Sequence, residues 1–170
     1  DLVLTSRGHE AEIRFLEAGP LRARLVIKQH LRIPRELAPD RTTRGSETTI
    51  LPIHTTVTVE ANSALVKFHT AVSNTARDHR LRVLFPTGIQ TTVSHAETQF
   101  DVVTRPISPQ RYDDSTIPEN VKQVIIGARE PEPVTIYPQR AFVDLNDGAR
   151  GLAVLNQGLP EVEILPGQNT

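Results

Sequence analysis

The sequence predicts an all-β protein, an antiparallel β-sandwich with little helix. The 170-residue chain is punctuated by 13 prolines and nine glycines. Val, Ile and Thr fill the stretches between them, and turn signals recur about every ten residues. Two half-buried sheets must cover each other's apolar faces, which favours a sandwich and leaves a closed barrel as the alternative. We expect residues 1–170 to form a single domain, because this length buries about two thirds of the unfolded surface.

Strands and turns alternate through the first half of the chain. The segment from Leu21 to Leu31 has apolar residues at every second position up to Ile27, which is typical of a half-exposed strand. This period is lost from Ile33 to Glu47, where we expect a loop or a hairpin tip. The alternation resumes from Ile50 to Glu60, and a turn at residues 61–63 leads into a hairpin partner from Val66 to Val72.

The segment NTARDHRLRVLFPTG, residues 74–88, joins a charged turn to a further predicted strand. Leu81, Val83 and Phe85 alternate with other residues, which predicts a strand that is buried on one face. Pro86 ends this run because proline has no N–H to donate to a ladder.

The charged residues of this segment have two interpretations. Guanidinium groups make directed hydrogen bonds, so Arg77, Arg80 and Arg82 could serve an interface. The alternative is a solvated outer face, because charged side chains are mostly exposed. With Asp78 and His79 between the arginines, we interpret the cluster as an interdomain or solvent-facing edge.

Proline and turn signals divide the second half of the chain. One or two strands are predicted from Ile89 to Thr104, and further strands from Val134 to Leu165 with a turn at Asp147-Gly148. Between them, residues 106–133 contain five prolines and are expected to be a surface excursion. A short strand from Val121 to Ile126 is possible within this excursion.

The composition restricts the classes of partner and the cellular compartment that we expect for this chain. The net charge is −1, from 19 basic and 20 acidic side chains, which argues against nucleic acid and acidic membranes as partners. No apolar run approaches the roughly 20 residues that cross a bilayer, and the first residues are too charged for a signal peptide. Cysteine is absent, which mildly favours a cytoplasmic location. Methionine is also absent, so we expect a fragment of a longer protein or a processed chain.

The sequence lacks the motifs of a catalytic or metal site. None of the six histidines forms a His-x-His or His-x-x-x-His pair, so no metal ligands are predicted. The carboxylate pairs Asp113-Asp114 and Glu161 with Glu163 are interpreted as solvated surface groups. Nucleophile motifs and phosphate-binding glycine loops are absent as well, so no catalytic residue is assigned.

Three blocks of the sequence carry a family resemblance. They are NTARDHRLRVLFPTG, HAETQFDVVTRP (His95 to Pro106) and YPQRAFVDLNDGARGLAVLNQGLPEVEIL (Tyr137 to Leu165). In this order they resemble the C-terminal β-sandwich region of glycoside hydrolase family 38 α-mannosidases of the bacterial branch. The resemblance implies a galactose-mutarotase-like supersandwich. It also implies a parent enzyme that cleaves α-mannosidic bonds with retention, using zinc held in a separate catalytic domain.

The resemblance also implies partners and candidate site residues. In the family the β-domain packs on the catalytic and helical domains of the same chain and lends loops to the cleft for mannose-containing glycans. The second block supplies candidates for a sugar-facing or interdomain role: His95, Glu97, Gln99 and Arg105. Ordinary structural hydrogen bonding is the alternative for each.

A free-standing carbohydrate-binding or adhesion module is the alternative function, since a fold does not fix a function. With only two tyrosines and no tryptophan, the chain has few aromatic rings to stack on sugars, which counts against that alternative.

Overall fold

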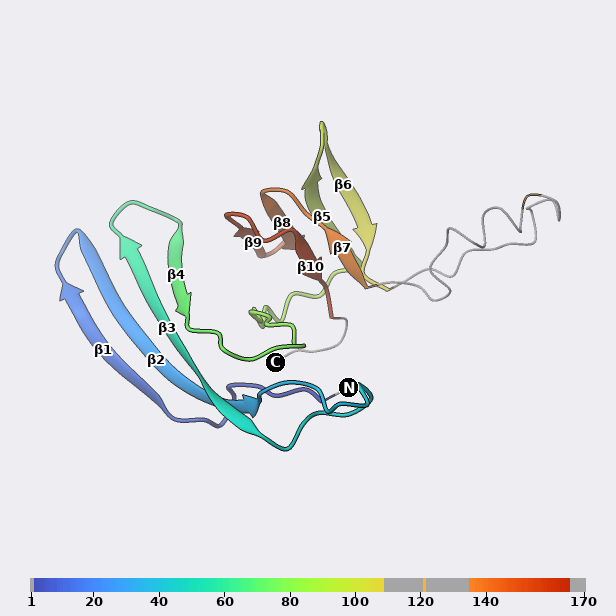
Figure 1. Cartoon of the computed structure of the whole chain (residues 1–170). Helices are drawn as coiled ribbons and strands as arrows, with labels where there is room; N and C mark the ends of the chain where they lie inside the picture. The colour runs from blue at the N-terminus through green and yellow to red at the C-terminus, as the bar shows by residue number, and fades with distance from the viewer. Residues whose placement is uncertain (1, 109–120, 122–134, 166–170) are drawn as a thin grey trace. The chain divides into compact units, whose positions relative to one another are not determined.

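The structure is a computed structural model that describes residues 2–108, 121 and 135–165. The chain divides into two compact units, Asp1–Arg82 and Val83–Thr170. Every sheet in the described residues is antiparallel, and all of the elements assigned there are strands (Figure 1), which confirms the predicted all-β, antiparallel class. Most of the predicted excursion at 106–133, including residues 122–126 of its possible strand, lies outside the described residues.

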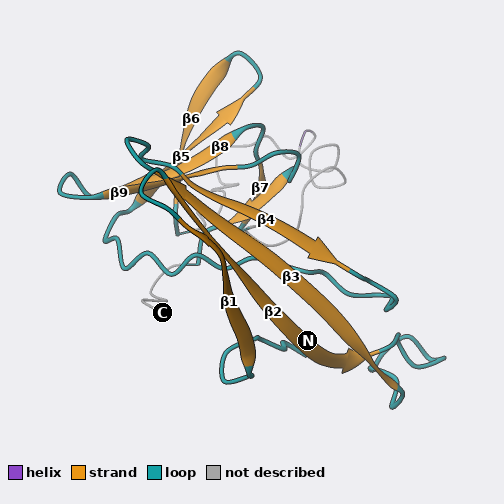
Figure 2. Ribbon diagram, turned by 90° about the vertical axis from the view of Figure 1, so that its left-hand side faces the viewer, coloured by secondary structure: helices purple, strands orange, loops and turns teal. Residues whose placement is uncertain are grey.

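The first unit is one four-stranded sheet in the order β1-β2-β3-β4. Its strands are β1 (Ala11–Ala18), β2 (Arg22–Pro34), β3 (Thr48–Glu60) and β4 (Val66–Val72). They lie side by side in chain order, and β2 and β3 run as the two long central strands (Figure 2). The strands predicted from Leu21, Ile50 and Val66 are therefore confirmed.

Strand β1 was missed by the sequence analysis, although its pattern is visible. Ile13 and Phe15 alternate with Glu12 and Arg14, the period of two expected for a strand. The register pairs Ile13 with Ile27 and then shifts between Phe15 and Glu17, so that Leu16 is an additional residue in a β-bulge.

The core of the first unit gathers where β2 and β3 are joined by residues 35–47. Leu51 is its most deeply buried side chain, with 2% of its surface exposed. The other members of this cluster are Leu31, Ile33 and Ala76, with Ile53 and Val72 packed against them. Directly paired residues share a face of the sheet, and Leu31 pairs with Leu51 while Ile53 pairs with Val72. The core therefore covers one end of one face.

The strand predicted at residues 81–85 is wrong. Residues 80–91 belong to no strand, and the boundary between the two units falls between Arg82 and Val83. Leu81, Val83 and Leu84 are all about half exposed, at 49%, 62% and 57%. Alternation shows that a segment could lie on a sheet, but a strand also needs a neighbouring strand to accept its ladder of hydrogen bonds.

The second unit contains a four-stranded sheet in the order β6-β5-β8-β9. Its strands are β5 (Val93–Thr98), β6 (Asp101–Pro106), β8 (Phe142–Asn146) and β9 (Gly151–Leu155). The short strands β7 (Ile136–Pro138) and β10 (Glu161–Glu163) form a separate two-stranded sheet. Ser94, Ala96 and Val143 are buried on one face of the larger sheet. The strands predicted within 89–104 and 134–165 are thus confirmed.

Candidate functional site

The β5–β6 hairpin carries the four residues predicted to face sugar or another domain, but it places three of them on two opposite faces and Gln99 at its tip. His95 and Glu97 alternate with the buried Ser94 and Ala96, so they lie on the opposite, more open face. Arg105 pairs directly with Ser94 and therefore lies on the same face as that serine. The structure brings His95 and Glu97 together and separates them from Arg105.

A neighbouring strand adds an acidic residue beside His95. Asp144 of β8 is its register partner, and Asp144 Oδ2 lies 3.6 Å from His95 Nδ1. The side chains remain 37% and 29% exposed, so both can be reached from solvent. An imidazole oriented through Nδ1 presents Nε2 as its second hydrogen-bonding atom. Together with the carboxylate of Glu97, this face can donate to and accept from the hydroxyl groups of a ligand.

Arg105 is held by the two-stranded sheet. Its Nη1 donates a hydrogen bond of 2.8 Å to the carbonyl of Pro138. The guanidinium carbon lies 4.9 Å from the centre of the Tyr137 ring, within the range of a cation–π contact. These contacts tie β6 to β7 and support a structural role for Arg105.

The tip of the hairpin consists of Gln99 and Phe100, both exposed. Phe100 has a φ of 69°, a conformation that side chains other than glycine rarely adopt, and its side chain is fully exposed. Next to the tip, the Val102 amide donates a 2.7 Å hydrogen bond to the Asp101 carboxylate. The sequence predicts Phe100 within the strands from Ile89 to Thr104, whereas in the structure it lies in the turn between β5 and β6.

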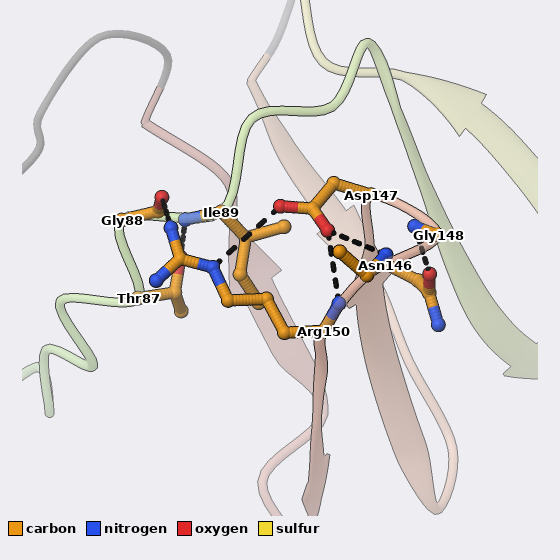
Figure 3. Close-up of polar contacts among 8 residues, drawn as sticks. Thr87, Gly88, Ile89, Asn146, Asp147, Gly148 and Arg150 are labelled. Atoms are coloured by element: carbon orange, nitrogen blue, oxygen red, sulfur yellow. Dashed lines mark hydrogen bonds and ion pairs between the residues drawn. The ribbon is translucent and has the colours of Figure 1, made fainter.

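The turn between β8 and β9 makes polar contacts within itself and with the segment of the same chain at Gly88 (Figure 3). The Asp147 carboxylate accepts 3.0 Å hydrogen bonds from the amides of Ala149 and Arg150, and these backbone donors lower the pKa of that carboxyl group. The Arg150 guanidinium also donates to the carbonyl of Gly88 (Figure 3). Gly148 has a φ of 87°, so the turn predicted at Asp147-Gly148 is confirmed. The turn thereby anchors the segment that leads into β5.

Asp78 holds a loop of the first unit. Its Oδ2 accepts a 3.3 Å hydrogen bond from the Leu37 amide, and its Oδ1 lies 3.5 Å from the Arg41 guanidinium. Arg44 donates to the Asp78 carbonyl. Asp78 has a φ of 55°, which aspartate tolerates better than most residues. The charged turn at 77–80 therefore contributes to closing the loop at 35–47, in addition to any role at an edge.

The described residues do not fit a zinc site. In the parts of the chain that the structure describes, no three His, Asp or Glu side chains come together as metal ligands would. The same residues include no helix that is long and apolar enough to span a membrane.

This arrangement defines a class of protein: a β-domain with antiparallel sheets, whose described residues include a polar face around His95 and Asp144 and no cluster of metal-ligating side chains. A family model described as "Glycosyl hydrolases family 38 C-terminal domain" matches residues 3–169. The chain therefore belongs to this family, as the three sequence blocks indicated.

Relatives of known description are much longer than this chain. A protein of Halalkalibacterium halodurans described as "Putative mannosylglycerate hydrolase" is 27% identical, and the match covers 95% of this chain and 18% of the relative. Two solved structures from Enterococcus faecalis, a family 38 glycosyl hydrolase protein and an α-mannosidase, are each 30% identical with TM-scores of 0.77 and 0.76. Each match covers 95% of this chain and 18% of the solved chain, and the likeness confirms the predicted β-sandwich fold class.

Proposed function

We propose that this chain is a non-catalytic β-domain of an α-mannosidase-like glycoside hydrolase, which packs on a zinc-dependent catalytic domain and helps to shape its sugar cleft. One observation carries the proposal: the chain matches the relatives over 95% of its own length but over only 18% of theirs. A segment with this relation to its family is a module of a larger enzyme. Its partners would be the catalytic and helical domains of the same parent.

The chemistry of the parent would depend on groups outside this chain. A retaining glycosidase uses one carboxylate as nucleophile and a second carboxyl group as general acid and base. Zinc bound in the catalytic domain would supply Lewis-acid orientation of sugar hydroxyls. The face with His95, Glu97 and Asp144 would add hydrogen bonds to a mannose-containing glycan, because its imidazole and carboxylates are partly exposed.

The proposal is tested by comparing three proteins on an aryl α-mannoside and on mannosylglycerate. These are the isolated chain, the full-length hydrolase that contains it, and that hydrolase with residues 1–170 deleted. We expect turnover by the full-length protein alone. Full activity of the isolated chain, or unchanged activity after the deletion, would contradict the domain role.

The same polar face is the observation that favours the second candidate, a free-standing carbohydrate-binding module. That function predicts measurable affinity of the isolated chain for mannose-containing glycans in titration calorimetry. Loss of this affinity in His95→Ala and Glu97→Ala would assign it to the β5 face. This candidate function also requires that the natural protein has no mannosidase catalytic domain.

A further inference from the structure

The two faces of the β1–β4 sheet differ sharply in chemistry. The register aligns Phe15 with Leu25, Leu25 with Val57, and Val57 with Phe68. Directly paired residues share a face, so these side chains form one row across all four strands. Further apolar residues of the same face are Ile13, Ile27, Ala23, Val59 and Val66. We call these nine residues the β1–β4 apolar face.

Much of the β1–β4 apolar face is exposed. Phe15 and Ile13 have 68% and 63% of their surface accessible, and Val66 has 52%. The same face continues into the buried core around Leu31 and Leu51. Protein atoms therefore cover this face at one end and leave it accessible at the other. Contiguous apolar surface of this kind marks an interaction site in a soluble protein.

The opposite face carries three cross-strand ion pairs and the buried Val26. Lys28 pairs with Glu12 at 3.4 Å, Arg22 with Glu17 at 2.9 Å, and Lys67 with Glu60 at 2.6 Å. Such a face is stable in water without a covering layer. The exposed row of large apolar side chains, in contrast, lies on the apolar face.

We propose that the β1–β4 apolar face is the surface on which this chain docks against the rest of the same hydrolase polypeptide. This proposal rests on the proposed function and names its interface. The occupant follows from the length of the relatives, since 82% of each solved relative lies outside the match that covers 18% of it. A segment linked in the same chain also has an effective concentration in the millimolar range, which favours it over a second copy. The face carries no charge that would recognise a polyanion.

Thiol labelling can test this interface, because the chain contains no cysteine of its own. Phe15→Cys and Val66→Cys place a thiol on the apolar face. Arg14→Cys and His69→Cys serve as matched controls, because they lie on the same two strands with their side chains on the opposite face. Each variant is made in the isolated chain and in the full-length hydrolase, and maleimide labelling is followed by mass spectrometry of the modified peptide. Thermal unfolding verifies that every variant is folded.

We expect all four thiols to react rapidly in the isolated chain. In the full-length hydrolase, the two apolar-face thiols should react at least about tenfold more slowly, as expected for groups that react only after local opening, while the controls are unchanged. Equal rates in the full-length protein would overturn the proposal. Slow labelling in the monomeric isolated chain would mean that the chain covers this face itself. Slow labelling only in a dimer would assign the face to a second copy of the chain. Either result would overturn the proposal. The labelling rates do not depend on mannosidase activity. The deletion assay described above tests the proposed function, so the two proposals can fail separately.

Discussion

Asp144 Oδ2 lies 3.6 Å from His95 Nδ1 across the paired strands β8 and β5. The pair is partly exposed, and exposed ion pairs contribute only about 0–1 kcal/mol to stability. Its position next to Glu97 on the open sheet face is the basis of the sugar-binding role proposed for it.

Changing this pair is therefore expected to affect sugar binding in the parent enzyme. Asp144→Asn and His95→Gln should each raise KM for an aryl α-mannoside about threefold or more, equivalent to losing one modest hydrogen bond. The free energy of unfolding of the isolated chain should change by less than about 1 kcal/mol. His69→Gln, which changes an exposed histidine of β4, is the control. An unchanged KM in both variants would remove this face from the sugar cleft.

Stability of the first unit should depend on the core at Leu51. Leu51→Ala deletes a side chain that is 2% exposed, and we expect it to lower the free energy of unfolding by about 2–5 kcal/mol. Leu21→Ala is the matched control, since Leu21 is 75% exposed and its loss should cost less than about 0.5 kcal/mol. Urea titration followed by circular dichroism measures both. Equal effects would mean that the cluster around Leu51 does not stabilise the sheet.

Acid should weaken the turn between β8 and β9. The folded-state pKa of Asp147 is lowered by backbone amides, so its ionised form stabilises the folded state above the unfolded value of 3.8. This contribution is lost as the pH falls from that value through the lower folded-state pKa. Asp147→Asn should therefore destabilise the chain at pH 7, and the difference from wild type should shrink below pH 3.8. Urea unfolding at several pH values measures it, and Glu10→Gln controls for the loss of one exposed charge. A difference that does not vary with pH would contradict this role.

Phe100 should be less favourable for folding than glycine at the same position. Because its φ is 69°, Phe100→Gly is expected to stabilise the isolated chain by about 0.5–1 kcal/mol. Phe100→Ala keeps the steric conflict of a Cβ atom and should give no such gain. Thermal unfolding of the two variants distinguishes backbone strain from loss of the ring. If alanine stabilised the chain as much as glycine, the exposed ring would be the cause.

The fold was predictable from the sequence where alternation and turn residues agree. The strands at Arg22–Pro34, Thr48–Glu60 and Val66–Val72 follow from that pattern. The segment at 81–85 shows the same alternation and forms no strand, because alternation does not reveal whether a neighbouring strand is available to pair with.

The candidate site was only partly predictable, because it depends on register. His95 and Arg105 are both odd-numbered, yet the two-residue turn at Gln99 and Phe100 pairs odd positions of β5 with even positions of β6. The two side chains therefore lie on opposite faces. Asp144 lies 38 residues beyond Pro106, the last residue of β6, and no local pattern indicates that it pairs with His95.

The β-bulge at Leu16 has a consequence for the chain on its own. Strand β1 is an outer edge of its sheet, and an exposed edge offers unpaired backbone groups to other molecules. The bulge interrupts the regular edge after Phe15, so the strand offers a foreign strand only a short template for growth into fibrils. A sheet with an exposed apolar face thus has an edge strand whose bulge limits self-assembly.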